Sequence, residues 1–88
     1  MKIKDGFIVR RIVDEILIVP VGARIADFNG LVSINETGMT LWEALQQEST
    51  EQQLVDALLE NYEVDEQTAA HDVSAFLDVL RKNNLLVE

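Results

Sequence analysis

Few side chains in this chain of 88 residues have the type and spacing that catalysis or metal binding requires. His71 is the only histidine, and the neighbouring acids Asp72 and Glu66 do not complete a recognisable ligand set or proton-transfer pair. None of the three serines has a base at a recognisable spacing. We therefore interpret His71 as an exposed surface residue of a helix.

The sequence also lacks the motifs of cofactor chemistry. It contains no cysteine, which excludes disulfides, thiolate metal ligands and cysteine nucleophiles. No glycine-rich phosphate loop follows an expected strand, and the acids do not have the spacing of a calcium loop. We expect no catalytic residue, no metal and no cofactor, and therefore a protein that is not an enzyme.

The acidic residues are concentrated in one part of the chain. The formal net charge is −9; residues 1–35 hold four acids and five bases, whereas residues 36–88 hold twelve acids and two bases. Because nucleic-acid phosphates bind clustered bases, this distribution argues against a nucleic-acid partner. Two interpretations stay open: the acids attract a basic or neutral peptide or protein, or they provide solubility on exposed helix faces.

Length and composition predict a single small domain over residues 1–88. Hydrophobic residues make up 48% of the chain and charged residues 26%, as in ordinary globular proteins. The apolar runs are much shorter than the roughly 20 residues that span a bilayer, and no signal-peptide core is found at the start. We expect a soluble, cytoplasmic protein with no membrane partner.

Before residue 35 the pattern predicts short strands and turns. Residues 7–13 and 16–19 are expected to form a hairpin around the two-residue turn Asp14-Glu15. Both partners are rich in β-branched residues, and the second is expected to be buried on both faces.

The next segment predicts a bend and a second hairpin. Pro20–Gly22 should end the first pairing, because proline lacks an amide donor and glycine adds backbone freedom. Asn29-Gly30 favours a type I′ turn between residues 25–28 and 31–34. The bent middle strand would then pair first with strand one and afterwards with strand three, and residues 31–34 would form a sheet edge.

From Asn35 onward the apolar period changes to about 3.6, which predicts three helices. Asn35, Thr50 and Asp65 are the expected N-caps, with a capping box after Thr50. The last helix should stop at Asn83-Asn84, and residues 85–87 should fold back on the core. The expected apolar faces are Met39, Leu41, Trp42 and Leu45; Leu54, Val55, Leu58, Leu59 and Tyr62; and Ala69, Val73, Phe76, Leu77 and Leu80.

The predicted fold class is therefore α+β: a three-stranded antiparallel sheet followed by a three-helix bundle. A hairpin with three helices also occurs in winged-helix proteins that bind DNA. Here the third helix carries Glu66, Asp72 and Asp78, with its bases only at the far end, and this argues against DNA binding.

Three short motifs occur in order along this chain: Val19-Pro20-Val21-Gly22, then Asp27-Phe28-Asn29-Gly30, then Ile34-Asn35-Glu36-Thr37-Gly38 with Leu41-Trp42. Their order and spacing resemble the PqqD family, the pyrroloquinoline quinone biosynthesis protein D group. The resemblance extends from about Gly6 to Val87. It implies a truncated winged-helix-like fold and a peptide chaperone without catalytic activity, the recognition element for ribosomally made, post-translationally modified peptides.

The resemblance also implies a binding mode and partners. The leader segment of a precursor peptide would add as a strand beside residues 31–34, over a groove walled by the helix of residues 66–83. The chaperone would present it to a modifying enzyme, often a radical S-adenosylmethionine enzyme. The connection over residues 23–30 is longer than in the quinone-pathway members, which favours a different modified peptide as the product.

The residues themselves allow this mechanism. An unpaired edge offers backbone donors and acceptors to an extended peptide. The alternation of side chains along the strand predicts that Val32 and Ile34 point toward the core. Ala75 and Val79 lie off the core face of the last helix, and they either form a wall of the groove or are incidental surface aliphatics. Asp72 is placed to meet a basic leader residue. The predicted peptide-binding residues are Leu31, Val32, Ser33, Ile34, Asp72, Ala75, Phe76 and Val79.

Two alternatives stay open at this point. The chain could be a small acidic assembly subunit that docks on a partner through its helices, in which case Met39, Trp42 or the second apolar face would be partly exposed. We interpret Trp42 as a core residue instead. An edge strand can also pair with a second copy, so both a monomer and an edge-strand dimer are compatible with the sequence.

Overall fold

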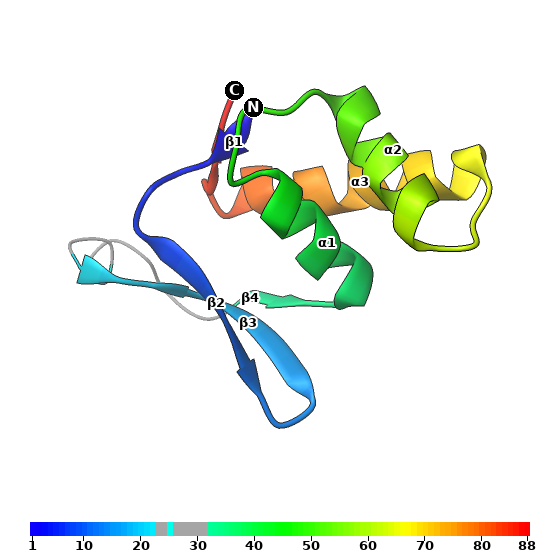
Figure 1. Ribbon diagram of the computed structural model, residues 1–88. Helices are drawn as coiled ribbons and strands as arrows, with labels where there is room; N and C mark the ends of the chain where they lie inside the picture. Colours follow the sequence, from blue (N-terminus) through cyan, green and yellow to red (C-terminus); the bar gives the residue numbers. More distant parts are fainter. Residues whose placement is uncertain (23–24, 26–31) are drawn as a thin grey trace.

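The computed structural model describes residues 1–22, 25 and 32–88 (Figure 1). The elements in chain order are β1 (Lys2–Ile3), β2 (Phe7–Ile12), β3 (Glu15–Pro20), β4 (Val32–Ile34), α1 (Glu36–Ala44), α2 (Glu51–Asn61), α3 (Glu66–Lys82) and β5 (Leu86–Val87). The three helices gather together, and the β2–β3 hairpin projects away from them (Figure 1). The predicted α+β class is confirmed. Among the described helices, none is long and apolar enough to cross a membrane.

The main sheet is antiparallel, with the strand order β2-β3-β4. Ile18 pairs with Val9 on one side and with Val32 on the other, so the two outer strands meet the same stretch of β3. The side chains of β3 are buried from residue 16 to residue 18. Their backbone groups need partners on both sides, and this central position supplies them.

The turn of the first hairpin lies one residue earlier than predicted. Ile12 pairs with Glu15, so the loop consists of Val13 and Asp14 rather than Asp14 and Glu15. The two alternatives differ by a slip of two residues, which returns every side chain to the same face of the sheet. The alternation of apolar residues therefore cannot distinguish between them.

The third strand pairs with the middle strand before the predicted bend and not after it. Residues 32–34 pair with residues 16–18, on the other side of β3 from β2. The expected partner segment, residues 25–28, lies outside the described residues except for residue 25. The end of the first pairing is confirmed, because β3 ends at Pro20 and Gly22 has a φ of 59°. The turn expected at Asn29-Gly30 lies outside the described residues.

All three predicted N-caps are confirmed. The Asn35 side chain accepts a hydrogen bond of 2.8 Å from the Gly38 amide, and Thr50 and Gln53 form the reciprocal capping box. Asp65 accepts from the amide three residues on, and this hydrogen bond lowers the pKa of its carboxyl.

The end of α3 also follows the prediction. Asn84 has a φ of 57°, and its amide donates to the carbonyl of Arg81 at 3.1 Å. The Leu85 amide donates to the carbonyl of Leu80 at 2.9 Å, which completes a Schellman motif. Both leucines are fully buried, so this cap folds the chain back onto the core.

A second, two-stranded sheet was not predicted. β1 pairs antiparallel with β5, with Ile3 opposite Leu86, and the Ile3 amide also donates to the carbonyl of Leu45. The two ends of the described chain therefore lie side by side (Figure 1). Strands of two residues have no measurable period, which explains why the sequence pattern did not reveal them.

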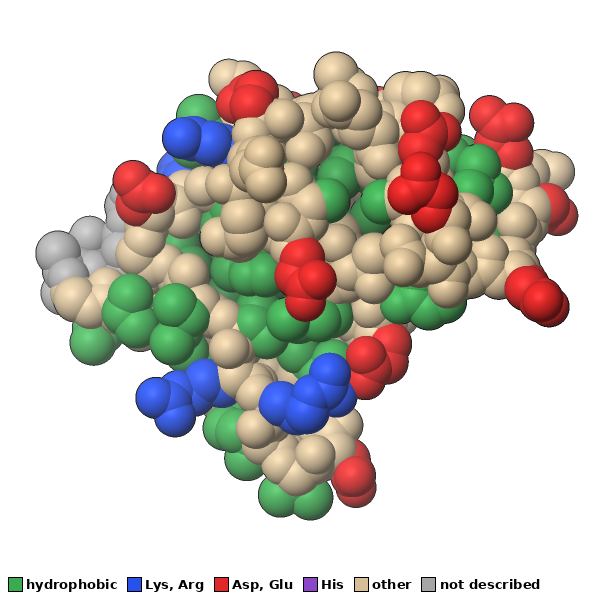
Figure 2. Space-filling view, viewed as in Figure 1, with side chains coloured by type: hydrophobic (Ala, Val, Ile, Leu, Met, Phe, Trp, Pro, Cys, Tyr) green, Lys and Arg blue, Asp and Glu red, His purple; other side chains and the backbone are tan. Residues whose placement is uncertain are grey.

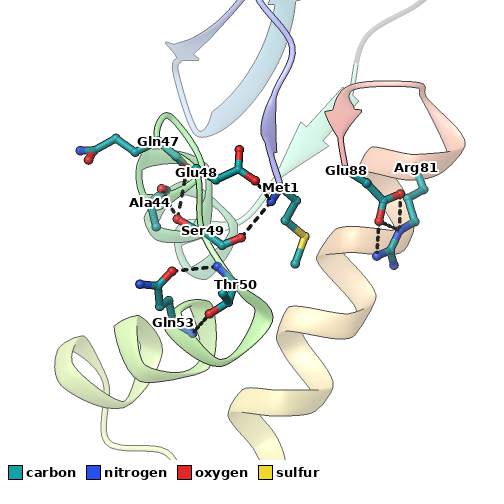
Figure 3. A network of polar contacts seen from close by, with 9 residues as sticks. All are labelled: Met1, Ala44, Gln47, Glu48, Ser49, Thr50, Gln53, Arg81 and Glu88. Atoms are coloured by element: carbon teal, nitrogen blue, oxygen red, sulfur yellow. Dashed lines mark hydrogen bonds and ion pairs between the residues drawn. The ribbon is translucent and has the colours of Figure 1, made fainter.

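Polar contacts hold the same corner of the molecule together (Figure 3). The amino group of Met1 contacts the Glu48 carboxylate and the carbonyl of Ser49, between α1 and α2. The Arg81 guanidinium donates to both oxygens of the Glu88 carboxylate, at distances of 2.9 to 3.3 Å, and lowers the pKa of that carboxyl.

The core lies between the helices and one face of the main sheet. The predicted apolar faces are confirmed for most of their members, and Trp42 is only 4% exposed. Met39 and Tyr62 are half-buried. Leu59 is exposed, contrary to the prediction, because it lies at the edge of the apolar stripe of α2. The fully buried large side chains are Ile18, Leu41, Leu45, Leu54, Leu58, Val73, Leu77, Leu80 and Leu85.

Candidate functional site

A groove lies between β4 and α3, with the first turns of α1 at its floor. It encloses about 200 Å³ and is open to solvent. Three elements supply its walls, and the residues that line it are Ser33, Ile34, Asn35, Thr37, Gly38, Leu41, Asp72, Ala75, Phe76 and Val79.

Six of the eight predicted site residues line this groove: Ser33, Ile34, Asp72, Ala75, Phe76 and Val79. Val32 does not, because its side chain faces the core, as alternation predicted, so only its backbone is available at the edge. Leu31 lies outside the described residues. The binding role of these residues stays a prediction.

The sheet supplies the first wall as an edge. β4 is the outermost strand of the sheet in the described part of the chain, since only β3 pairs with it. Along an antiparallel strand the backbone groups of successive residues point alternately to the two sides. Either Ser33 or its two neighbours therefore present an amide and a carbonyl to the groove side.

The second wall is one face of α3. Asp72, Ala75, Phe76 and Val79 follow the i, i+3, i+4, i+7 spacing of a single helix face. Phe76 is buried, whereas Ala75 and Val79 are exposed. The half-buried Asp72 is the one charged residue among those that line the groove in the described structure. The wall is therefore apolar with a carboxylate toward its N-terminal end.

The floor is supplied by α1, and the sequence analysis missed its residues. A Cβ atom on Gly38 would lie 3.1 Å from Cε1 of Phe76 and 3.2 Å from Cβ of Ile34. Only glycine therefore lets the two walls approach α1 this closely without a shift. Apart from proline, glycine has the lowest helix propensity, and its presence within α1 was the available signal.

The start of α1 is fixed by contacts to the sheet and to α2. The Arg11 guanidinium donates two hydrogen bonds to the Glu36 carboxylate, at 2.8 and 3.4 Å. These bonds raise the pKa of Arg11 and lower the pKa of Glu36. The Tyr62 hydroxyl donates to the carbonyl of Glu36 at 3.1 Å and lies 2.8 Å from the Thr40 hydroxyl. The groove floor is thereby held in place by β2 and by the C-terminal end of α2.

The lining of the groove is suited to binding an extended chain. It combines a strand edge, an apolar helix face and one carboxylate, which together match an extended peptide backbone with alternating side chains. His71 is exposed on α3, as predicted. In the described part of the chain no three His, Asp or Glu side chains are grouped so that they could hold a metal ion.

Comparisons with known proteins agree with this architecture. Residues 15–86 match the family model described as coenzyme PQQ synthesis protein D (PqqD). The chain is similar to the solved structure of TbiB1 in complex with the TbiA(beta) leader peptide, with a TM-score of 0.73 and 27% identity over 98% of this chain and 94% of that chain. No curated protein sequence matches it.

A second solved structure, lasso peptide synthetase B1 complexed with the leader peptide, has a TM-score of 0.72. The match covers 99% of this chain and 96% of the synthetase B1 chain, at 15% sequence identity. At this identity the likeness supports the fold alone.

Proposed function

Because the chain belongs to the PqqD family, we propose that it is a non-catalytic chaperone for the leader segment of a ribosomally made precursor peptide. The observation that carries the proposal is the groove between the β4 edge and the apolar face of α3. TbiB1, which shares 27% identity and nearly the whole length, is a leader-peptide complex, and this supports the same ligand class here.

In the proposed mode the leader extends the sheet as a strand beside β4. Backbone hydrogen bonds to the edge give affinity, and alternate leader side chains enter the groove and give selectivity. Ala75, Phe76 and Val79 suit an apolar leader side chain. Asp72 suits a basic one, since a charge-assisted hydrogen bond to a half-buried carboxylate is stronger than a neutral one.

The chaperone then delivers the leader to a peptide-modifying enzyme, either a radical S-adenosylmethionine enzyme or one of another class. The chain itself supplies no reacting group in this scheme. We still expect a product other than pyrroloquinoline quinone. This expectation rests on the length of the connection over residues 23–30, most of which lies outside the described residues.

The rival hypothesis of an assembly subunit is less well supported. It requires Met39, Trp42 or the apolar face of α2 to be partly exposed before a partner binds. Trp42 is buried, and so is most of the apolar face of α2, whereas Met39 is half-buried and Leu59 is exposed. The core already uses most of the apolar side chains named in that hypothesis.

The test is an NMR titration of the full chain with the leader peptide encoded beside its gene. We expect backbone amide shifts at Ser33, Ile34 and along residues 72–79. A peptide with the same composition in scrambled order is the control and should produce no such pattern. Shifts confined to α2 or the β2–β3 loop, or no shifts at millimolar peptide, would refute the proposed site.

A further inference from the structure

Three of the eight large apolar side chains that are exposed in the described part of the chain lie together on the β2–β3 hairpin. Ile8 is 40% exposed, Ile12 49% and Val13 89%. The two isoleucines lie on the face of the sheet that points away from the core, with Arg10 between them. We call Ile8, Arg10, Ile12 and Val13 the hairpin face. Figure 2 shows apolar side chains at the projecting tip, with basic side chains beside them.

Two more apolar residues share this face of the sheet. The half-buried Val19 lies opposite Ile8 and extends the exposed surface, whereas Leu17, opposite Arg10, is buried and does not. Directly opposite residues on one face are in contact, so Ile8 and Val19 form one apolar surface beside Arg10. An exposed apolar surface of this kind is typical of a contact with another protein.

Val13 adds a second, independent observation. Its φ of 56° places a β-branched residue in the left-handed region at the first position of the loop, where glycine or asparagine is favoured. With 89% of its surface exposed, this valine gains little from packing within its own chain. A strained residue without a folding role points to a function for the side chain.

Arg10 defines the chemistry of the partner. It forms no ion pair with any described acidic residue, whereas its neighbour Arg11 is bound to Glu36. A partner that covers the hairpin face would bury the Arg10 charge and must pair it, because an unpaired buried charge is strongly unfavourable. The matching surface is therefore apolar and carries a carboxylate.

A second copy of this chain is a poor match. Each copy has a formal net charge of −9, and antiparallel pairing of two full β2 strands would bring Arg10 of each copy diagonally next to Arg11 of the other. Like charges opposite one another destabilise a strand pair. The charges favour a different protein as the partner.

We propose that the hairpin face docks on the peptide-modifying enzyme through an apolar surface that carries a carboxylate. The choice of this enzyme rests on the proposed function, whereas the surface itself does not. β2 and β4 are opposite edges of one sheet, two strand spacings or about 10 Å apart, so enzyme and leader can be held at the same time.

The test measures the affinity of the full chain for the modifying enzyme encoded beside its gene, and separately for the leader peptide. Arg10→Glu should weaken enzyme binding about tenfold or more and change leader binding by less than about twofold. Lys82→Glu makes the same change of charge at the end of α3 and is the matched control. It should leave both affinities within about twofold of wild type.

Val13→Asn separates docking from folding. Asparagine tolerates the left-handed backbone, so the variant should melt about 4 °C higher or more, yet bind the enzyme more weakly. A variant that is more stable and docks less well cannot be explained by misfolding.

Several results would overturn the proposal. They are an unchanged enzyme affinity in both variants, equal loss of leader and enzyme binding in folded Arg10→Glu, no enzyme binding by the wild type, and a dimer in sedimentation that Arg10→Glu dissociates. A chain that binds the enzyme through this face but no leader would refute the proposed function and support the docking surface. A chain that binds the leader but not the enzyme would support the proposed function and refute the docking surface.

Discussion

The two edges of the main sheet are built differently. The β4 edge is three residues long in the described chain, and α1 and α3 enclose it with a mostly apolar wall. The β2 edge is six residues long, carries Arg10 and Arg11, and projects from the helices (Figure 1). Unpaired edges invite unwanted pairing unless charge or cover protects them. An edge becomes a selective site when a second element supplies a wall beside it, and only β4 has one.

Truncating the α3 side chain that forms the wall beside β4 should have the largest effect on the difference between the two edges. Phe76→Ala deletes a buried ring from α3 and should lower the free energy of unfolding by about 3 kcal/mol or more, since such truncations leave a cavity. Leader binding should be lost in conditions where the variant is still folded. Urea unfolding and the NMR titration measure the two effects.

The corresponding truncation at the other edge is the control. Ile8→Ala removes a side chain that is largely exposed and should cost about 1 kcal/mol or less, with leader binding retained. Equal losses in the two variants would contradict the distinction between a walled and an open edge.

Proline substitution tests whether the backbone of β4 is used. Because amides alternate in direction, one of Val32→Pro and Ser33→Pro removes a bond to β3, and the other removes an outward donor. The first should destabilise the fold by about 1–3 kcal/mol, because it leaves a carbonyl of β3 without its donor. The second should stay folded and bind the leader about tenfold more weakly.

Circular dichroism melting identifies which proline variant is which. If the variant that melts like the wild type also binds the leader normally, strand addition is excluded. Arg10→Pro, a proline substitution on the β2 edge, should leave leader binding intact, because that edge is not expected to pair with the peptide.

A smaller effect is expected at the floor of the groove. Gly38→Ala places a methyl group within 3.2 Å of Ile34 and Phe76, so the gain in helix propensity should be outweighed by overpacking of about 1 kcal/mol or more. The narrowed groove should bind the leader more weakly. Thermal melting and a binding titration measure this, and a more stable variant with full affinity would contradict the account of Gly38.

The carboxylate in the groove should affect affinity more than stability. Asp72→Asn keeps the shape of the side chain and should weaken binding of a leader with a basic residue about fivefold, with less change in high salt. Asp78→Asn, on another face of α3, is the matched control. An equal effect of both changes would show that the general acidity of the helix attracts the peptide.

The smallest expected effect is the pH dependence of the ion pair between Arg11 of the hairpin and Glu36 of α1. Arg11 lowers the pKa of Glu36, so this pair stabilises the fold above the ordinary glutamate pKa of about 4.3 and loses its contribution as the pH falls below it. Glu36→Gln should therefore melt at a lower temperature than wild type at pH 7, and the difference should shrink by pH 3. A constant difference across that range would exclude the ion pair as its cause.

Local signals in the sequence predicted most of the helical half. Side-chain caps act within three or four residues, so Asn35, Thr50 and Asp65 could be identified without knowledge of the fold. The helical period also left Ala75 and Val79 off the core face, and this placed them correctly in the groove wall.

The sheet and the groove floor depend on contacts between distant parts of the chain. The pairing of β4 with residues 16–18 is set by the backbone needs of the buried strand β3, which no local motif encodes. Gly38 and Leu41 enter the site only because α1 packs against Phe76. A pattern within one helix cannot reveal what another helix brings beside it.

The pairing of β1 with β5 has a mechanical consequence. A force applied at Lys2 and Val87 acts on neighbouring residues of two antiparallel strands, so it opens their pairs one after the other instead of shearing them together. The next pair to open joins the buried Ile3 and Leu86. A pull on both strands would therefore unzip the molecule at low load and extract core leucines before the groove is disturbed.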